Sequence, residues 1–160
     1  MELKRIEELE RLRHGFRPAA IATLFVGESP PAGGTFFYAA DARLYRALRA
    51  AFGGGADFLA EFRARGWFLD DLVLCPVNHK SIDERRRLHL RWLPSLAGRI
   101  AEYRPRVVVS LLLSIEEVVG EAVARAGIAG VRHYALPYPN RQPSRFRREL
   151  ALIVAELPVA

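Results

Sequence analysis

Cysteine is almost absent from this chain, which has one cysteine, Cys75, among 160 residues. A single cysteine excludes an internal disulfide and any metal site made of cysteines alone. No apolar run approaches the roughly 20 residues of a membrane-spanning helix. No serine lies in a Gly-x-Ser-x-Gly turn, and the glycines 53–55 follow a predicted helix instead of a strand, which argues against a serine hydrolase and against a phosphate-binding loop. We expect a cytoplasmic protein without membrane partner, metal or organic cofactor.

Positive charge is in excess, and arginine supplies most of it. The net charge is +6, and 51% of the residues are hydrophobic. This length and composition predict one globular domain over residues 1–160, which we expect to be a monomer. Arginine suits bidentate contact with phosphate, and such a charge is typical of nucleic-acid-binding proteins. Charge alone fits a merely soluble surface equally well.

Apolar runs alternate with helical patterns along the chain. The runs, which are typical of strands buried on both faces, cover residues 20–26, 67–75, 106–113 and 131–136. The helical patterns cover residues 3–17, 43–52, 57–65, 81–103, 114–126 and 144–157. Strands separated by helices predict an α/β fold with a four-stranded parallel sheet and right-handed crossovers.

Polar side chains mark three predicted helix starts. Asp41 is a candidate N-cap for the second helix. Ser81 and Glu84 have the spacing of a capping box, and Ser114 and Glu117 repeat it.

The segment Gly27-Glu28-Ser29-Pro30-Pro31 ends the first predicted strand. Proline cannot donate to a sheet ladder, so the strand must stop here. An acid and a hydroxyl are thereby presented at the exit of a strand, where open α/β sheets usually bind ligands.

Five segments, in their order, resemble motifs of the uracil-DNA glycosylase superfamily. They are Gly27–Pro31, Gly34–Phe37 with Arg43–Tyr45, Phe68–Pro76, Tyr103–Val109 and Leu136–Asn140. The resemblance extends from about residue 20 to the C-terminus. It implies a three-layer α/β/α sandwich around a central four-stranded parallel sheet. It also implies hydrolysis of the N-glycosidic bond of a deaminated or altered base (uracil, hypoxanthine or xanthine) flipped out of DNA.

The chain departs from the family pattern at several positions. Pro31 replaces the glycine that ends the first motif, and Tyr138 replaces the usual histidine of the last motif. Asp71 stands where an asparagine that reads the base is expected. Cys75 matches one of four cysteines that hold an iron–sulfur cluster in some relatives, but the other three are missing, so we expect no cluster.

The resemblance assigns Glu28 and Ser29 to the catalytic turn, with Glu28 orienting or deprotonating water and favouring positive charge on the sugar. The alternative for Glu28 is a loop carboxylate that caps a backbone N–H. Phe37 would stack on the flipped base, or it packs in the core like most phenylalanines. Phe36 or Tyr38 takes the stacking role if the register differs by one.

Asp71 would contact the base. An ionised aspartate offers only acceptors, so the O4 of uracil would lack a partner, at a cost of about 1–3 kcal/mol. A donor-rich base edge, or a protonated Asp71, would fit better. We therefore expect no strict uracil enzyme. Alternatively, Asp70 and Asp71 pair with arginines at a strand edge.

The stiff, proline-rich loop 137–143 is the last candidate. Tyr138 or Asn140 would donate to the developing negative charge of the base, and Arg141 and Arg145 would contact DNA. A rigid turn between strand and helix is the alternative.

Other polar groups receive ordinary roles. We expect an ordinary polar loop at Asn78, His79 and Lys80. We expect His89 and His133 to be structural, because neither has metal-ligand spacing to another candidate ligand. Three functions remain open: a DNA glycosylase, a non-catalytic nucleic-acid-binding relative, and an α/β enzyme acting on a small phosphorylated or nucleoside-like ligand.

Overall fold

The computed structural model describes residues 2–160, and it confirms the α/β class with a four-stranded, all-parallel sheet. The strands are β1 (Thr23–Gly27), β2 (Trp67–Asp71), β3 (Val107–Ser110) and β4 (Arg132–Ala135). The helices are α1 (Glu2–Gly15), α2 (Arg43–Ala51), α3 (Phe58–Ala64), α4 (Ile82–Tyr103), α5 (Glu116–Ala126) and α6 (Pro143–Ile153). Short 3-10 turns are η1 (Phe37–Ala39), η2 (Leu113–Ile115) and η3 (Val154–Glu156).

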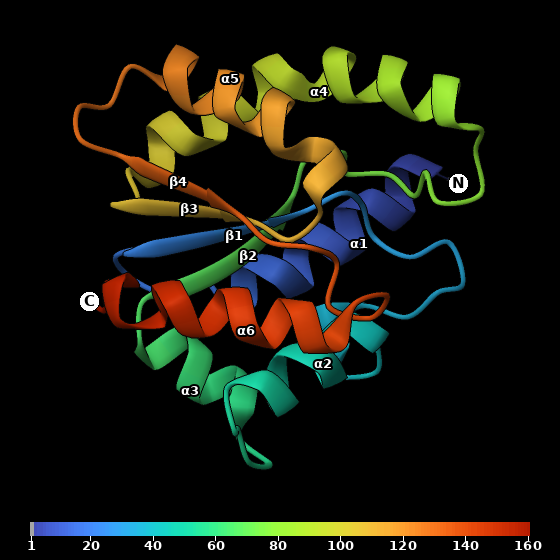
Figure 1. Cartoon of the computed structure of the whole chain (residues 1–160). Helices are drawn as coiled ribbons and strands as arrows, with labels where there is room; N and C mark the ends of the chain where they lie inside the picture. Colours follow the sequence, from blue (N-terminus) through green and yellow to red (C-terminus); the bar gives the residue numbers. More distant parts are fainter. Residues whose placement is uncertain (1) are drawn as a thin grey trace.

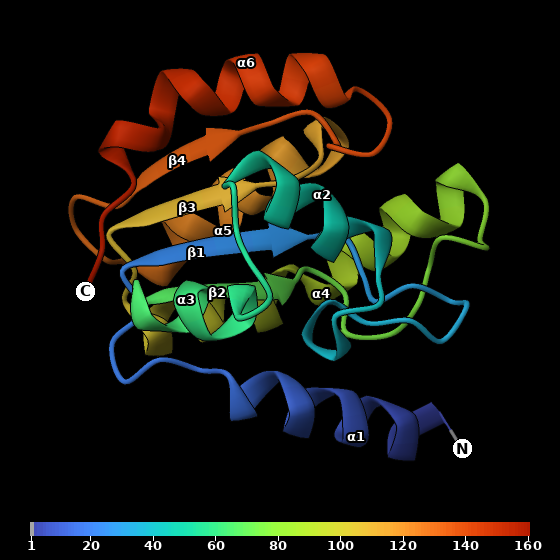
Figure 2. The same cartoon turned by 90° about the horizontal axis from the view of Figure 1, so that it is seen from below.

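Helices cover both faces of the sheet, whose strand order is β2-β1-β3-β4. Helices α4 and α5 pack together over one face, and α2, α3 and α6 lie over the other (Figure 1). Helix α1 runs along the outer side of β2 (Figure 2). Within residues 2–160, no helix is both long and apolar enough to cross a membrane.

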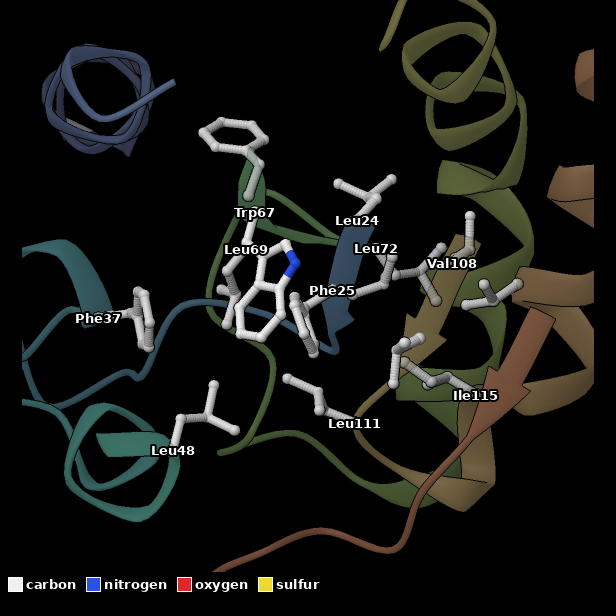
Figure 3. Close-up of a cluster of buried hydrophobic side chains, with 14 of the residues drawn as sticks. Leu24, Phe25, Phe37, Leu48, Trp67, Leu69, Leu72, Val108, Leu111 and Ile115 are labelled. Atoms are coloured by element: carbon white, nitrogen blue, oxygen red, sulfur yellow. The ribbon is translucent and has the colours of Figure 1, made fainter. Parts of the chain in front are cut away.

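The core forms on the central strands because they are covered on both sides. Every residue of β1 and β3 is buried, as their near-continuous apolar sequences predict. On the α2 and α3 side, Phe25 packs against Trp67, with ring centroids 5.5 Å apart, and against Phe62 at 5.4 Å. Figure 3 shows this cluster, with Phe25 and Trp67 at its centre and Phe37 at one side.

Two strands end several residues before their predicted apolar runs end. β2 ends at Asp71 instead of Cys75, and β3 ends at Ser110 instead of residue 113. After β2, the N–H groups of Leu72 and Val73 still donate to the carbonyls of residues 27 and 28, each at 2.9 Å. The segment that follows β1 then reaches its two prolines at residues 30–31, which cannot donate to a sheet ladder. The residues after Val73 therefore have no ladder partner, and they leave the sheet.

One of the three predicted N-caps is confirmed. Ser81 and Glu84 form a complete capping box at the start of α4. Asp41 does not cap α2; its carboxylate accepts a hydrogen bond from the N–H of Phe36 at 2.8 Å and closes the preceding loop. Ser114 does not cap α5 either, because it lies inside the 3-10 turn η2 that precedes that helix.

The topology marks one crevice as a ligand site. β1 leads into α2 on one face of the sheet, whereas the neighbouring β3 leads into α5 on the other face. The connections therefore diverge at the carboxyl ends of β1 and β3, the place where open α/β sheets bind ligands.

Candidate functional site

A cavity of about 990 Å³ opens at the carboxyl ends of the strands. Its wall is built from the segments that follow β1 and β3, the end of β2, the turn at residues 35–37, the first turns of α2 and α4, and the loop at residues 138–141. Elements far apart in the sequence therefore converge on one space at the topological switch point.

Glu28 lies in the wall of this cavity, directly after β1. Arg85 binds its carboxylate with both ends of the guanidinium: Nε donates to Oε2 at 3.0 Å and Nη2 to Oε1 at 2.5 Å. His89 Nε2 lies 2.7 Å from Oε2, and it must be the donor because an ionised carboxylate only accepts. Burial alone would raise the pKa of Glu28, but the hydrogen bonds from His89 and Arg85 lower it below its usual value. Glu28 is therefore ionised at neutral pH.

The capping box of α4 explains how Arg85 and His89 reach Glu28. Ile82, Arg85 and His89 are three and four residues apart, so they share one face of the helix. All three line the cavity. From the sequence, His89 is expected to be structural, and nothing distinguishes Arg85 from the other arginines. The spacing from the predicted capping box was the signal that could have placed both residues beside the strand ends.

Asp71 reaches the cavity from the end of β2, in register with Gly27. Its Oδ2 accepts a hydrogen bond from Arg13 Nη2 at 2.8 Å. Its Oδ1 accepts no hydrogen bond from any described residue, and it lies so near Gly27 that a Cβ there would be only 2.7 Å away. Burial raises the pKa of Asp71 above its usual value in spite of Arg13. The residue thus presents one unpaired oxygen at the cavity.

A buried charge network supports Asp71 from behind. Arg13 is fully buried, and besides Asp71 it contacts Asp70, with Nε 3.6 Å from Oδ1, and Glu10, with Nε donating at 2.9 Å. Asp70 also accepts hydrogen bonds from Tyr103 at 2.9 Å and has Arg99 Nη1 at 3.0 Å. Asp70 therefore has the alternative role of pairing with arginines. Asp71 pairs with an arginine through only one of its two oxygens.

The pKa values of Arg13 and Asp70 both shift in the direction opposite to the one that burial alone would cause. Burial by itself would lower the pKa of Arg13, but Asp71 and Asp70 raise it. Burial would raise the pKa of Asp70, but Arg13 and Arg99 lower it. Arg13 therefore stays charged, and it holds α1 against β2.

Three consecutive aromatic residues, Phe36, Phe37 and Tyr38, follow the two glycines at residues 33–34, and each is only 3% exposed. Phe36 and Phe37 line the cavity. The Arg13 guanidinium lies 5.1 Å from the centroid of the Phe36 ring, next to Asp71. The Phe37 ring packs edge-on against Tyr45 and points toward the buried cluster (Figure 3). Tyr38 has a different task, because its hydroxyl is hydrogen bonded to both the N–H and the carbonyl of Leu69.

The loop 137–143 supplies the remaining predicted groups. Tyr138, Asn140 and Arg141 line the cavity. Burial raises the pKa of the half-buried Tyr138, so its hydroxyl keeps its proton and can donate. Arg145 lies one turn into α6, outside the cavity wall, and its Nε is 3.3 Å from a carboxylate oxygen of Glu149.

Two polar side chains fasten the loops of the cavity to each other. Ser29 Oγ accepts a hydrogen bond from the N–H of Val77 at 3.3 Å. Asn78 Oδ1 accepts one from the N–H of Ala32 at 3.0 Å. The segments after β1 and β2 are therefore tied together, which fixes the position of Glu28.

No group of three potential metal ligands occurs within the described part of the chain. His133 lies outside the cavity, where its Nε2 is 2.8 Å from Ser110 Oγ and burial lowers its pKa. The polar groups that line the cavity are carboxylates, imidazole, phenol, amide, hydroxyl and guanidinium groups.

Comparison with known proteins gives no family assignment. No protein-family model matches the chain, and no curated protein shows significant sequence similarity to it. The resemblance to the uracil-DNA glycosylase superfamily stays a prediction from the motifs.

Proposed function

We propose that this chain is a DNA glycosylase-like enzyme of the uracil-DNA glycosylase type, which hydrolyses the bond between a sugar and an altered base. One observation carries the proposal: an ionised acid, two aromatic rings and an unpaired carboxylate oxygen share a single cavity at the topological switch point. The order of the motifs and the four-stranded parallel sheet agree with it.

Glu28 is the residue on which the chemistry depends. Oε1 accepts one hydrogen bond from Arg85, and a carboxylate oxygen can accept two, so a water can be held at the second site. During the reaction the bond from C1′ to the base nitrogen breaks, and its electron pair leaves with the base. The water oxygen bonds to C1′, and the proton that this water loses ends on the departing base. A carboxylate with a lowered pKa is a weak base, so its main contribution is to orient the water and to stabilise the cationic sugar.

The departing base needs a donor and a platform. The protonated hydroxyl of Tyr138 or the amide of Asn140 donates to the negative charge that develops on the base. The rings of Phe36 and Phe37 form the aromatic part of the wall. Phe36, which lies beside Arg13 and hence beside Asp71, is the better placed of the two to stack on a base that Asp71 contacts.

Asp71 points to the class of base. Its unpaired Oδ1 accepts a hydrogen bond when ionised and can carry a proton under the raised pKa. An N–H edge, such as the N1–H of hypoxanthine or xanthine, fits the ionised form. The N3–H of uracil fits it as well. All three bases place a carbonyl oxygen beside this N–H, and the ionised form leaves that oxygen unpaired, so we expect an enzyme that is not strictly selective for uracil.

The test is a cleavage assay on single- and double-stranded oligonucleotides that carry uracil, hypoxanthine, xanthine or mismatched thymine, followed by alkali. Replacing Glu28 by Gln keeps the size and removes the charge, and we expect it to reduce cleavage by about a hundredfold or more. Glu117→Gln is the matched control: it replaces an exposed carboxylate on α5 by a carboxamide and should leave cleavage unchanged. Cleavage that survives Glu28→Gln contradicts the proposal. Asp71→Asn supplies a donor for the carbonyl oxygen, so in the same assay it should raise the cleavage of uracil, hypoxanthine and xanthine alike.

A second function is favoured by one contact. Arg85 and His89 together occupy both oxygens of Glu28, which would keep the acid from the reaction in a non-catalytic nucleic-acid-binding protein. Such a protein would bind oligonucleotides in a salt-dependent manner without cleaving any of them. The same oligonucleotides, measured for binding as well as cleavage, separate the two functions.

A further inference from the structure

A second, smaller cavity of about 480 Å³ adjoins the one described above. It lies between the first turns of α2 and α6, which approach each other below the sheet in Figure 1, and the loop before α6 closes one side. Arg43, Arg46 and Asn140 line both cavities, so the two cavities share part of their walls.

The smaller cavity is lined by three guanidinium groups and by no carboxylate. Arg43 and Arg46 come from α2, and Arg147 comes from α6, about a hundred residues later. None of the three forms an ion pair with any residue in the part of the chain that the structure describes. The side chain of Arg46 makes one hydrogen bond, to the backbone carbonyl of Asp41 at 3.1 Å.

Two arginines outside this cavity have a carboxylate partner one turn away on their own helix. Arg125 pairs with Glu121 on α5 at 2.9 Å, and Arg145 pairs with Glu149 on α6 at 3.3 Å. Arg147, two residues from Arg145 on the same helix, faces the cavity instead. Arg91 on α4 and Arg148 on α6 also form no ion pair with any described residue. The three arginines of the cavity differ from them because they gather around one space that no carboxylate lines.

Like charges that converge without a counter-ion repel each other, and a bound anion removes that cost. Guanidinium groups match the oxygens of a phosphate in pairs, and the amide of Asn140 adds a neutral donor. Pro139 and Pro143 flank this amide and stiffen its loop, while the buried Phe146 closes the cavity from the side of the core. The N-terminal turns of α2 and α6 add positive potential, since neither has a side-chain cap.

We propose that Arg43, Arg46 and Arg147, together with Asn140, form a phosphate-binding subsite next to the main cavity. The wall that it shares with the main cavity places a bound phosphate beside a base that occupies that cavity. A DNA strand or a free nucleotide supplies the same phosphate chemistry. The subsite requires no bond cleavage, so it stands independently of the glycosylase function.

The experiment measures binding of a fluorescent single-stranded oligonucleotide of unmodified DNA by anisotropy at several salt concentrations. It compares the wild type with Arg147→Gln and with Arg148→Gln, a matched control that removes the same charge from an exposed neighbour on α6 outside both cavities. We expect Arg147→Gln to weaken binding and to reduce the slope of log K against log salt by about 0.7, the value for one phosphate contact with a single strand. Arg148→Gln should leave the slope unchanged.

A second arm separates the two sources of phosphate. Inorganic phosphate and a deoxynucleoside 5′-monophosphate are each titrated into the wild type and both variants, with the thermal unfolding midpoint as readout. A midpoint that rises for the wild type and Arg148→Gln but not for Arg147→Gln, without a change in oligonucleotide slope, supports the subsite and assigns it to small phosphates. Equal losses in both variants in the two arms, or no loss in either, overturn the proposal. Because neither ligand contains an altered base, the outcome does not depend on whether the chain excises one.

Discussion

Glu28 and Asp71 face one cavity from neighbouring strands, and each binds an arginine, yet their pKa values shift in opposite directions. Glu28 receives three hydrogen bonds from Arg85 and His89, which outweigh its burial. Asp71 receives one from a side chain, and its partner Arg13 is shared with other carboxylates. Asp71 is also the more deeply buried of the two. The balance between burial and the donors and cations around a carboxylate therefore sets the direction in which its pKa shifts.

The largest expected effect is the loss of stability when Asp71 loses its arginine partner. Arg13→Met leaves buried carboxylates without their cation, which typically costs about 3–5 kcal/mol of stability. Arg85→Met leaves Glu28 with His89 and some solvent access, so we expect a loss of only about 1–2 kcal/mol. Urea unfolding followed by tryptophan fluorescence measures both losses. Adding Asp71→Asn to Arg13→Met should restore part of the stability, and equal losses in the two single variants would contradict the difference between the sites.

A smaller effect is expected from Gly27→Ala. The new methyl group would lie 2.7 Å from Asp71 Oδ1, so Asp71 must move, at a cost of about 1–3 kcal/mol. Gly98→Ala is the matched control, since it lies inside α4 with no atom near its added methyl group and should gain about 0.5–1 kcal/mol. Both values come from the same urea experiment. A Gly27→Ala protein as stable as the wild type would show that Asp71 is not confined against β1.

The smallest effect, and the sharpest for the comparison, is in the pH dependence. The lowered pKa of Glu28 stabilises the fold above its ordinary value of 4.5, and this contribution is lost as the pH falls below it. The raised pKa of Asp71 acts the other way, because the folded state binds that proton more tightly and loses stability as the pH rises above 3.8.

Unfolding between pH 3 and 7 tests these signs. The advantage of the wild type over Glu28→Gln should grow with rising pH, whereas its advantage over Asp71→Asn should shrink. Parallel curves for the two variants would show that the carboxylates titrate alike.

The fold was largely predictable because its strongest signals are local. β1 and β3 are continuous apolar runs, which only a sheet covered on both faces accommodates, and the capping box at Ser81 stands in four adjacent residues. The end of β2 was not predictable from its own sequence, because it depends on where the partner strand stops.

The candidate site was predictable only in part for the same reason. Glu28 directly follows a predicted strand, so the sequence places it at the edge of the sheet. Asp71 lies inside the predicted run 67–75, and it reaches the same edge only because β2 ends there. Arg13 lies 58 residues before Asp71, on a helix whose pattern indicates only an amphipathic surface, and nothing local connects the two. Arg85 and His89 become candidates once the helix start is known, but their contact with Glu28 is a property of the tertiary structure.

The contacts along β2 also decide how the sheet ends. This strand is the first in the order, so its outer backbone groups would otherwise be available to a strand from another molecule. The hydroxyl of Tyr38 takes both the N–H and the carbonyl of Leu69, and Arg13 Nη1 donates to the same carbonyl. Arg99 binds the next carbonyls, at Asp71 and Leu72. Side chains thereby fill the positions that intermolecular strand pairing would use. Arg13, which also binds Asp71 at the site, is one of the residues that block this edge.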